Sequence, residues 1–400
     1  MKILKLQNIA EIVMGQSPEA EFVSSDKIGL PLLNGPAEFT DRYPVPVQFT
    51  SLGKRIAEEK DILFCVRGST TGRMNIADQK YAIGRGLAAI RHKKNPKLNP
   101  YVKALIEVNL KKLLGGTLGS VFPNITKDNL FDLECVAHDE SNQQKIASIL
   151  SAIDDKIELN NKINAELEGM AKLIYDYWFV QFDFPYDFGQ GKPADETSNP
   201  KDVKPYKSSG GKMVWNKELK REVPEGWGVK ELGKYANIKK GTLITEKTAD
   251  TSGNIKVVSA GLGFSYHHSS PNFPKNTITI SASGASAGFI NFWREPIFAC
   301  DCITVRGGSE AETLFILGFL KVRQEYLYSQ ARGSAQPHVY PKDIDGLHIA
   351  IPDKGLIKKF GELTVPGNNM ISINLNENQQ LSSLRDWLLP MLMNGQVRVD

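Results

Sequence analysis

The chain has 400 residues, a formal net charge of +4, 41% hydrophobic residues and 24% charged residues. This composition indicates a globular protein of two or three domains and excludes disordered and collagen-like classes. No apolar run approaches the length that crosses a bilayer, and the N-terminal stretch lacks a signal-peptide core, so we expect a cytoplasmic protein without membrane association. The mild positive charge permits nucleic-acid binding without indicating it.

The cysteines do not form a disulfide framework or a zinc site. Only Cys300 and Cys302 are close in sequence, and no second His or Cys pair stands near them. We expect all four cysteines, Cys65, Cys135, Cys300 and Cys302, to be reduced thiols on strands, and we expect no metal in this chain.

Residues 1–140 predict a mixed α/β domain. Apolar runs at 61–66 and 87–91 are typical of buried strands, and residues 100–114 carry helical spacing. Residues 141–185 predict one long helix, because apolar and Asn positions recur at alternating spacings of mostly four and three, as in a coiled-coil seam. The seam positions are 146, 150, 153, 157, 160, 164, 167, 171, 174 and 178.

Residues 186–224 are polar and rich in Pro, Gly and Ser, which predicts a long surface linker. Residues 225–352 predict a second α/β domain, with strands over 277–283 and 297–305 and a helix over 312–327. Residues 353–400 predict a second long helix. Pro366 and Gly367 lie inside it, so we expect a break or kink there.

The second half of the chain repeats the first. The stretch Gly119–Leu133 matches Gly333–Leu347, 214 positions later, without a gap. The same offset continues through the helical segments, and Gly68 matches Gly284 at an offset of 216. The sequence therefore predicts an α+β protein with two tandem copies of a unit of about 200 residues. Its two α/β domains would be separated by two long helices packed as an antiparallel coiled coil, with pseudo-two-fold symmetry.

Two asparagine pairs are predicted at the seam of these helices. In an antiparallel pairing, Asn160 faces Asn378 and Asn164 faces Asn374. A buried asparagine fixes the register of a coiled coil at a cost in stability. The alternative, that these side chains are solvated at the edge of the seam, is equally open.

Several segments resemble the specificity (S) subunit of Type I restriction–modification systems. They are VMGQSP (13–18), DILFCVRGSTTGR (61–73), YAIGRGLAAIR (81–91), ELEGMAKLIYDYWFVQFDFP (166–185), YKSSGGKMVWNKELKREVPEGW (206–227) and LLPMLMNGQV (388–397). The resemblance implies two target-recognition domains, 1–140 and 225–352, that each read half of a bipartite double-stranded DNA site. It also implies that the helical spacers, 141–185 and 353–400, dock two methyltransferase (M) subunits, which restriction (R) subunits join. It implies no catalysis in this chain and places S-adenosylmethionine, ATP and Mg on the partners.

Motifs for catalysis are missing from the sequence. The chain has no Asn/Asp-Pro-Pro-aromatic motif, and FGQG (188–191) lies in the linker rather than after a strand. GSTTGR (68–73) lacks the lysine and the spacing of a P-loop.

Polar residues in predicted Gly-, Ser- and Pro-rich turns are the candidates for DNA contact, because Arg suits guanine and Gln or Asn suits adenine. In the first domain they are Gln16, Ser17, Arg67, Ser69, Thr70, Arg73, Arg85, Asn124 and Lys127. In the second they are Lys239, Lys240, Thr242, His267, His268, Ser283, Ser286, Arg332, Gln336, His338 and Tyr340. The alternative is structural: an arginine near a strand end often pairs with a carboxylate, and Asn124 can cap a turn.

Equivalent loops differ between the copies, with Arg67, Arg73 and Arg85 matching Ser283, Phe289 and Asp301. Such differences fit two domains that read different half-sites, and they also fit drift in unimportant loops. Aromatic and apolar residues at the helix ends are candidates for partner docking, with an intramolecular core as the alternative. They are Tyr175, Tyr177, Trp178, Trp387 and Leu388.

A non-catalytic DNA-recognition subunit is the leading hypothesis. The alternative is a protein-interaction scaffold whose two domains bind protein, and an enzyme is a third possibility. Steep weakening of binding with salt separates the first from the second. Methyl transfer by the purified chain alone would favour the third.

Overall fold

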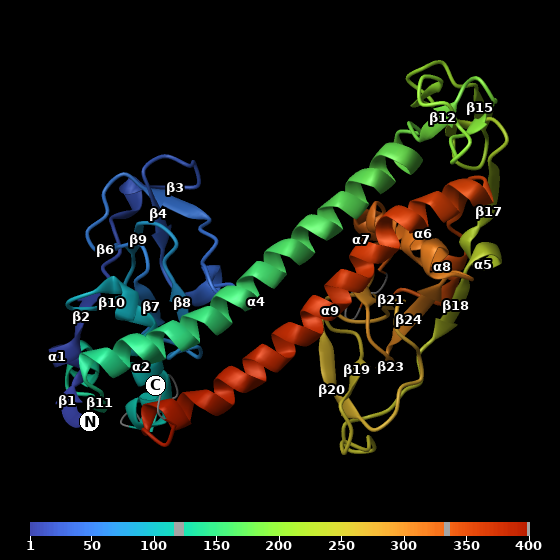
Figure 1. The fold of residues 1–400 in the computed structure, drawn as a ribbon. Coiled ribbons are helices and arrows are strands. Elements are labelled where there is room, and N and C mark those ends of the chain that lie inside the picture. The colour runs from blue at the N-terminus through green and yellow to red at the C-terminus, as the bar shows by residue number, and fades with distance from the viewer. Residues whose placement is uncertain (116–123, 332–336, 398–400) are drawn as a thin grey trace. The chain divides into compact units, whose positions relative to one another are not determined.

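The computed structural model describes residues 1–115, 124–331 and 337–397. The chain forms two units, unit 1 (Met1–Asn160 with Asn376–Asp400) and unit 2 (Asn161–Leu375). Each unit holds one sheet-rich head and a part of both long helices (Figure 1). We call residues 1–139 head 1 and residues 228–351 head 2. The α+β class expected from the sequence is confirmed.

Head 1 is built around a four-stranded antiparallel sheet in the order β2-β10-β7-β8. The strand bounds are Ala10–Met14 (β2), Leu87–His92 (β10), Ile62–Cys65 (β7) and Met74–Ile76 (β8). Alternate side chains of a strand point to opposite faces. Ile62 and Phe64 belong to the core formed with helix α2 (Asn99–Gly115), while Leu63 and Cys65 pack with a second sheet. Burial on both faces explains why β7 is a continuous apolar run.

The second sheet of head 1 has five strands in the order β3-β5-β4-β9-β6, and its β4–β9 pair is parallel. The strand bounds are Val23–Ser24 (β3), Gln48–Thr50 (β5), Leu30–Leu33 (β4), Tyr81–Ile83 (β9) and Ile56–Ala57 (β6). A two-stranded ribbon pairs the beginning of head 1 with its end. The strands of this ribbon are β1 (Lys2–Lys5) and β11 (Glu134–Ala137), and the short helices α1 (Leu6–Ile9) and α3 (Lys127–Phe131) lie next to them in the chain.

Head 2 repeats this topology. Its main sheet has the order β18-β24-β21-β22, and its second sheet, β20-β19-β23, again contains a parallel pair, β19–β23. The main-sheet bounds are Asn237–Lys240 (β18), Cys302–Arg306 (β24), Thr277–Ser281 (β21) and Ile290–Trp293 (β22). The others are Phe264–His268 (β20), Ile255–Val258 (β19), Ile297–Ala299 (β23), and the ribbon of β17 (Gly228–Glu231) with β25 (His348–Ile351). The tandem repeat predicted from the sequence is therefore confirmed for the main sheet, the ribbon and the parallel pair, while the second sheet of head 2 has three strands instead of five.

One glycine contact is the same in both heads. Gly15 follows β2, and Gly241 follows β18 at an offset of 226. A Cβ atom at Gly15 would lie 2.1 Å from the carbonyl oxygen of Gly84, and one at Gly241 would lie 2.1 Å from that of Cys300. Only glycine lets the two backbone segments approach this closely.

Two predicted elements of head 2 are each divided in the structure. The sequence predicts one helix over 312–327. The structure has two, since α6 (Glu310–Lys321) ends at Lys321 and α7 (Gln324–Gln330) begins after a short turn. Arg323 leaves the helical region (φ −105°, ψ 15°), and its guanidinium stacks 3.8 Å from the ring of Phe319. The run 297–305 likewise forms two strands, because the chain turns at Asp301.

The two long helices, α4 (Glu140–Tyr175) and α9 (Lys354–Met393), pair antiparallel in each unit. In unit 1, Asn160 donates to Asn378 at 2.9 Å, and in unit 2, Asn374 donates to Asn164 at 2.8 Å. Both predicted pairs are confirmed. Asn160 is 0% exposed and Asn374 is 5% exposed, so these are buried polar layers and the solvated alternative is wrong for them.

The polar layer in unit 1 is larger than the sequence indicated. Asn160 also donates to a carboxylate oxygen of Glu377 at 2.7 Å and accepts from Lys156 at 3.0 Å. Lys156 and Glu377 form an ion pair of 3.1 Å. The hydrogen bonds of Asn160 and Lys156 hold the pKa of Glu377 below its ordinary value.

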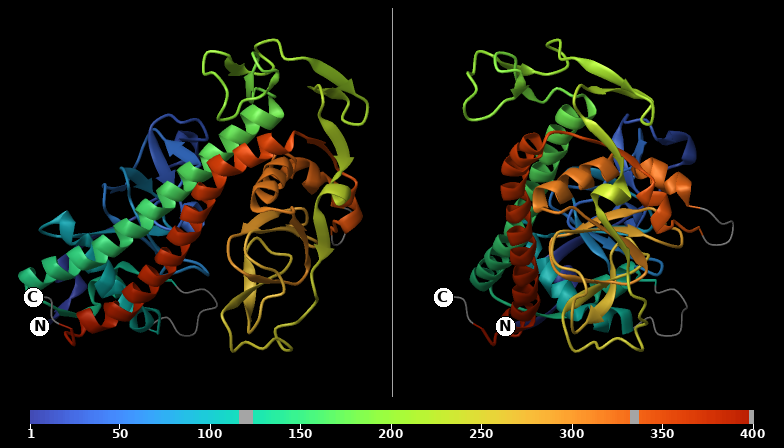
Figure 2. Two further views of the ribbon diagram at one scale, coloured as in Figure 1. Left: turned by 45° about the vertical axis from the view of Figure 1, so that its right-hand side comes forward. Right: turned by 90° about the vertical axis from the view of Figure 1, so that its right-hand side faces the viewer.

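The sequence predicted a break or a kink at Pro366. The break is absent, because α9 is one continuous helix of 40 residues. The helix changes direction along its length (Figure 2), which agrees with the kink. Phe360 and Ile371, on the two sides of the proline, are buried, and their packing offsets the hydrogen bond that Pro366 removes. A Cβ atom at Gly367 would lie 3.5 Å from Leu167 of α4, so the helices approach closely here.

The segment expected as a surface linker folds within unit 2. Its strands are β12 (Pro185–Asp187), β13 (Lys192–Pro193), β14 (Val203–Pro205), β15 (Met213–Asn216) and β16 (Arg221–Pro224). The rings of Phe184 and Tyr206 stack with 4.7 Å between their centroids. Buried aromatic side chains thus form the core of this segment, although its overall composition is polar.

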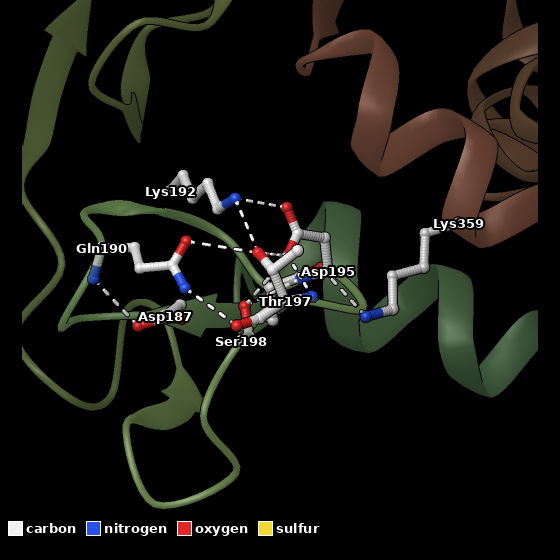
Figure 3. A network of polar contacts seen from close by, with 8 residues as sticks. Asp187, Gln190, Lys192, Asp195, Thr197, Ser198 and Lys359 are labelled. Atoms are coloured by element: carbon white, nitrogen blue, oxygen red, sulfur yellow. Dashed lines mark hydrogen bonds and ion pairs between the residues drawn. The ribbon is translucent and has the colours of Figure 1, made fainter.

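A polar network supports the first half of this segment (Figure 3). Lys359 of α9 donates to the carbonyl oxygen of Ala194 at 2.9 Å. Hydrogen bonds from Lys192 and Thr197 hold the pKa of Asp195 well below its ordinary value. The segment is therefore attached to α9 inside unit 2.

The four cysteines are free, as predicted, and all four are buried. Cys65, Cys135 and Cys302 lie on strands, and Cys300 directly follows one. Within the described residues, no helix is both long enough and apolar enough to span a bilayer.

Candidate nucleic-acid interface

The loop between β7 and β8 presents several of the predicted residues of head 1. Gly68 and Gly72 both have positive φ angles, +94° and +93°, which glycine adopts readily. Between them, Ser69 and Thr70 are exposed. The thiol of Cys65 donates to the carbonyl oxygen of Arg67 at 3.3 Å. The loop is thus fixed at its base while its side chains face solvent.

Three chain segments meet beside this loop. The N–H of Val66 donates to the carbonyl oxygen of Gly86, and the N–H of Ile125 donates to that of Val66, both at 2.9 Å. The neighbouring residues Arg67, Arg85 and Asn124 are therefore brought together, and all three are exposed. Neither Arg67 nor Arg85 is ion-paired with a carboxylate within the described residues.

Ser17 extends this group, because its hydroxyl oxygen accepts a hydrogen bond from the N–H of Arg85 at 3.3 Å. Gln16 is exposed beside it, with its N–H bonded to the carbonyl oxygen of Ile83 at 2.9 Å. The structure thus gathers most of the predicted residues of head 1 on one surface.

Arg73 and Lys127 have intramolecular partners. Arg73 donates to the carbonyl oxygen of Phe39 at 2.8 Å, and its guanidinium stacks on the ring of Phe39. Lys127 begins α3, and its ammonium lies 4.6 Å from the ring centroid of Phe131. The structural alternative therefore accounts for Arg73.

Head 2 brings together the equivalent residues. Gly284 and Gly288 have φ angles of +75° and +89°, like their counterparts in head 1. Ser283 pairs with His338 as Arg67 pairs with Asn124, and the Ser283 hydroxyl donates to a carboxylate oxygen of Asp301 at 2.6 Å. The His338 ring stacks on that of Tyr340, which is exposed.

The other predicted residues of head 2 are more dispersed. Lys239 and Lys240 are exposed on β18, Thr242 follows Gly241, and Ser286 lies in the loop between Gly284 and Gly288. His267 and His268 lie on β20 in the second sheet, where His268 packs edge-on against Phe298. Arg332 and Gln336 lie outside the described residues. Asp301 was not among the predicted DNA-contact residues, although it is the equivalent of Arg85 in the sequence repeat.

The partner-docking candidates divide by burial. Tyr175 and Trp178 are buried in the core of unit 2, in contact with Phe360. Leu388 packs on the core of unit 1. Tyr177 is 39% exposed and Trp387 is 56% exposed. An intramolecular role accounts for Tyr175, Trp178 and Leu388, and the two exposed rings are available to a partner.

The described residues contain no group of three or more His, Cys, Asp and Glu side chains that could hold a metal ion. The chemistry that this surface offers is hydrogen bonding and charge.

Comparison with known proteins agrees with the repeat. Residues 1–169 and 224–360 match the family model described as type I restriction modification DNA specificity domain. The chain is 24% identical over 410 aligned positions to the Type I restriction enzyme HindI specificity subunit of Haemophilus influenzae, covering 86% of this chain and 88% of that protein.

Two relatives from Methanocaldococcus jannaschii match over shorter regions. The MjaIX specificity subunit is 26% identical over 311 residues, which cover 73% of this chain and 66% of that protein. The MjaX specificity subunit is 38% identical over 166 residues, or 41% of this chain and 38% of that protein. The chain thus spans less than two thirds of either archaeal relative.

A solved structure shares the fold. The Type I restriction–modification S subunit from M. genitalium superposes with a TM-score of 0.62 and 18% identity, covering 98% of this chain and 95% of that one. Because the family model matches most of the chain in two consecutive regions, the protein belongs to the family of type I restriction–modification DNA specificity subunits.

Proposed function

We propose that this chain is the DNA-recognition subunit of a type I restriction–modification complex and that each head reads one half of a bipartite, asymmetric double-stranded target. One observation carries the proposal. The main sheets of the two heads have the same strand order and the same loop, yet the loops present different side chains. Two heads that share one fold but differ in their surface side chains suit a DNA target whose two halves differ in sequence.

The exposed basic and amide side chains of head 1 support binding to DNA. Lys and Arg contacts with phosphates supply affinity, and contacts with base edges supply sequence choice. The chain itself would be non-catalytic. Methyltransferase partners, two in number, would flip and methylate the target base with S-adenosylmethionine. Restriction partners would use ATP and Mg, and the complex would act in the cytoplasm.

The long helices supply a surface on which the methyltransferase subunits could dock. Large apolar side chains remain exposed along them, and exposed apolar side chains in groups mark interaction sites. They are Leu159, Ile163, Met170 and Leu173 of α4, and Leu363, Met370, Ile373, Leu375, Leu384 and Trp387 of α9. Tyr177, at the end of α4, adds an exposed aromatic ring.

The decisive experiment expresses this gene with its neighbouring methyltransferase gene in a host that lacks both, followed by genome-wide methylation mapping. The expected result is an adenine mark at one asymmetric split motif that disappears when this gene is omitted. Replacing residues 1–140 by those of a relative should change one half of the motif only. A stable complex that leaves no mark, associates independently of salt and is not retained on DNA would instead support a protein-interaction scaffold.

Docking has its own test. Trp387→Ser should weaken capture of the methyltransferase subunit about tenfold or more, because exposed tryptophans are frequent hot spots. Leu262→Ser, at a residue 63% exposed in a loop of head 2, is the matched control and should not weaken it. Equal capture by both variants would remove Trp387 from the interface.

A further inference from the structure

Three equivalent positions form the same cluster in both heads. In head 1 they are Arg67, Arg85 and Asn124, and in head 2 they are Ser283, Asp301 and His338. The first two pairs match at an offset of 216 and the third at 214. The bridges Arg67–Asn124 and Ser283–His338 show that the folded structure preserves this correspondence.

Equivalent backbone hydrogen bonds hold the two clusters. The N–H of Ile125 donates to the carbonyl oxygen of Val66 at 2.9 Å, and the N–H of Val339 donates to that of Ala282, also at 2.9 Å. Val66, Ile125, Ala282 and Val339 are all buried. Arg67 and Asn124 follow or precede these core residues and are exposed, so their side chains can change without repacking the core. The equivalent positions of head 2 are less exposed, since Ser283 is buried and His338 is half-buried.

The two clusters have opposite electrostatic character. Head 1 presents two guanidinium groups and an amide. Head 2 presents the carboxylate of Asp301, and the hydroxyl of Ser283 donates a hydrogen bond to one of its oxygens at 2.6 Å. The other oxygen of Asp301 can only accept hydrogen bonds once ionised.

Resting on the proposed function, we propose that these three positions determine the different base preferences of the two half-sites. Arg67 and Arg85 select guanine in the half-site of head 1, because guanidinium donates to the O6 and N7 acceptors of guanine. Asp301, oriented by Ser283, selects a base that presents an exocyclic amino group in the major groove, as cytosine and adenine do, in the half-site of head 2. A carboxylate is repelled by phosphates, so its place at a DNA surface indicates a base edge.

The test uses the methyltransferase–specificity complex in the expression host described above. Arg67→Ala with Arg85→Ala should relax the motif at a guanine in one half-site and leave the other half-site unchanged. Asp301→Ala should relax the opposite half-site, at a cytosine or an adenine, and the motif itself identifies which. Ser283→Ala should produce a weaker relaxation at the same base. Lys80→Ala, at an exposed lysine of head 1 outside the cluster, is the control and should keep the motif.

Purified complexes give the magnitude. Discrimination between the target and a duplex with the selected base replaced should fall by about 5- to 150-fold in each variant, the range for one good base contact. Equal weakening on every duplex, with an unchanged motif, would mean phosphate contacts and would overturn the inference. An unchanged motif in all variants would overturn it as well. No mark with the unmodified chain would refute the proposed function itself.

Discussion

The buried asparagine pair of unit 2 allows a quantitative test of the helix seam. Asn374 donates to Asn164 at 2.8 Å, and their exposed fractions are 5% and 8%. Replacing either residue alone by leucine leaves the other amide buried without this partner, which costs about 1–3 kcal/mol of unfolding free energy. Replacing both removes the polar layer, and a leucine pair at a seam is about neutral or stabilising.

We therefore expect each single variant, Asn164→Leu and Asn374→Leu, to lower the free energy of unfolding by about 1–3 kcal/mol. The double variant should recover most of that loss, giving a coupling energy of about 1–3 kcal/mol. Urea unfolding followed by tryptophan fluorescence measures this, since Trp178, Trp227 and Trp293 all lie in unit 2. Additive losses in the double variant would refute the pairing across the seam.

The other predictions concern single residues. Gly15→Ala should destabilise head 1 by about 1–3 kcal/mol, because the added Cβ would overlap the carbonyl oxygen of Gly84. Gly35→Ala is the control, because a Cβ there would meet open space, and thermal unfolding compares the two variants. Burial lowers the pKa of His92 below its ordinary 6.5, and its Nδ1 accepts two backbone hydrogen bonds. The folded state therefore favours the neutral imidazole, so the stability that this residue contributes above pH 6.5 should be lost as the pH falls through the folded pKa. His92→Asn keeps an acceptor and should flatten the dependence of melting temperature on pH; equal slopes would contradict this. Arg294→Met should lower stability by about 1.5–3 kcal/mol through lost charge-assisted bonds to Glu168 and Asn368, and an unchanged urea midpoint would count against it.

The periodic features of the molecule could be predicted from the sequence. The spacing of the seam positions predicted α4. It also predicted the pairing of Asn160 and Asn164 with asparagines of α9, because an antiparallel register fixes which positions face each other. Repeated motifs gave the duplicated heads, since equivalent glycines mark equivalent turns. Arg85 lies in an exposed turn as predicted, and Asn124 is exposed, although their proximity depends on strands distant in sequence.

Other features depend on contacts that a linear pattern does not contain. The turn at Arg323 depends on stacking against Phe319, and the folding of the segment after α4 depends on aromatic rings spread among polar residues. The continuity of α9 through Pro366 depends on burial of its neighbours. Asp301 was overlooked because a carboxylate is an unusual candidate for DNA contact, and its bond with Ser283 becomes visible only in the folded head.

The left-handed glycines at both ends of each loop have a consequence for how new specificities arise. Gly68 with Gly72, and Gly284 with Gly288, adopt the φ angles that the two ends of each loop require, whichever side chains stand at exposed loop positions such as Ser69 and Thr70. Selection can therefore exchange those side chains without first finding compensating changes in the core. The duplicated gene then offers two separate sites for such variation, and a change in one need not wait for a change in the other.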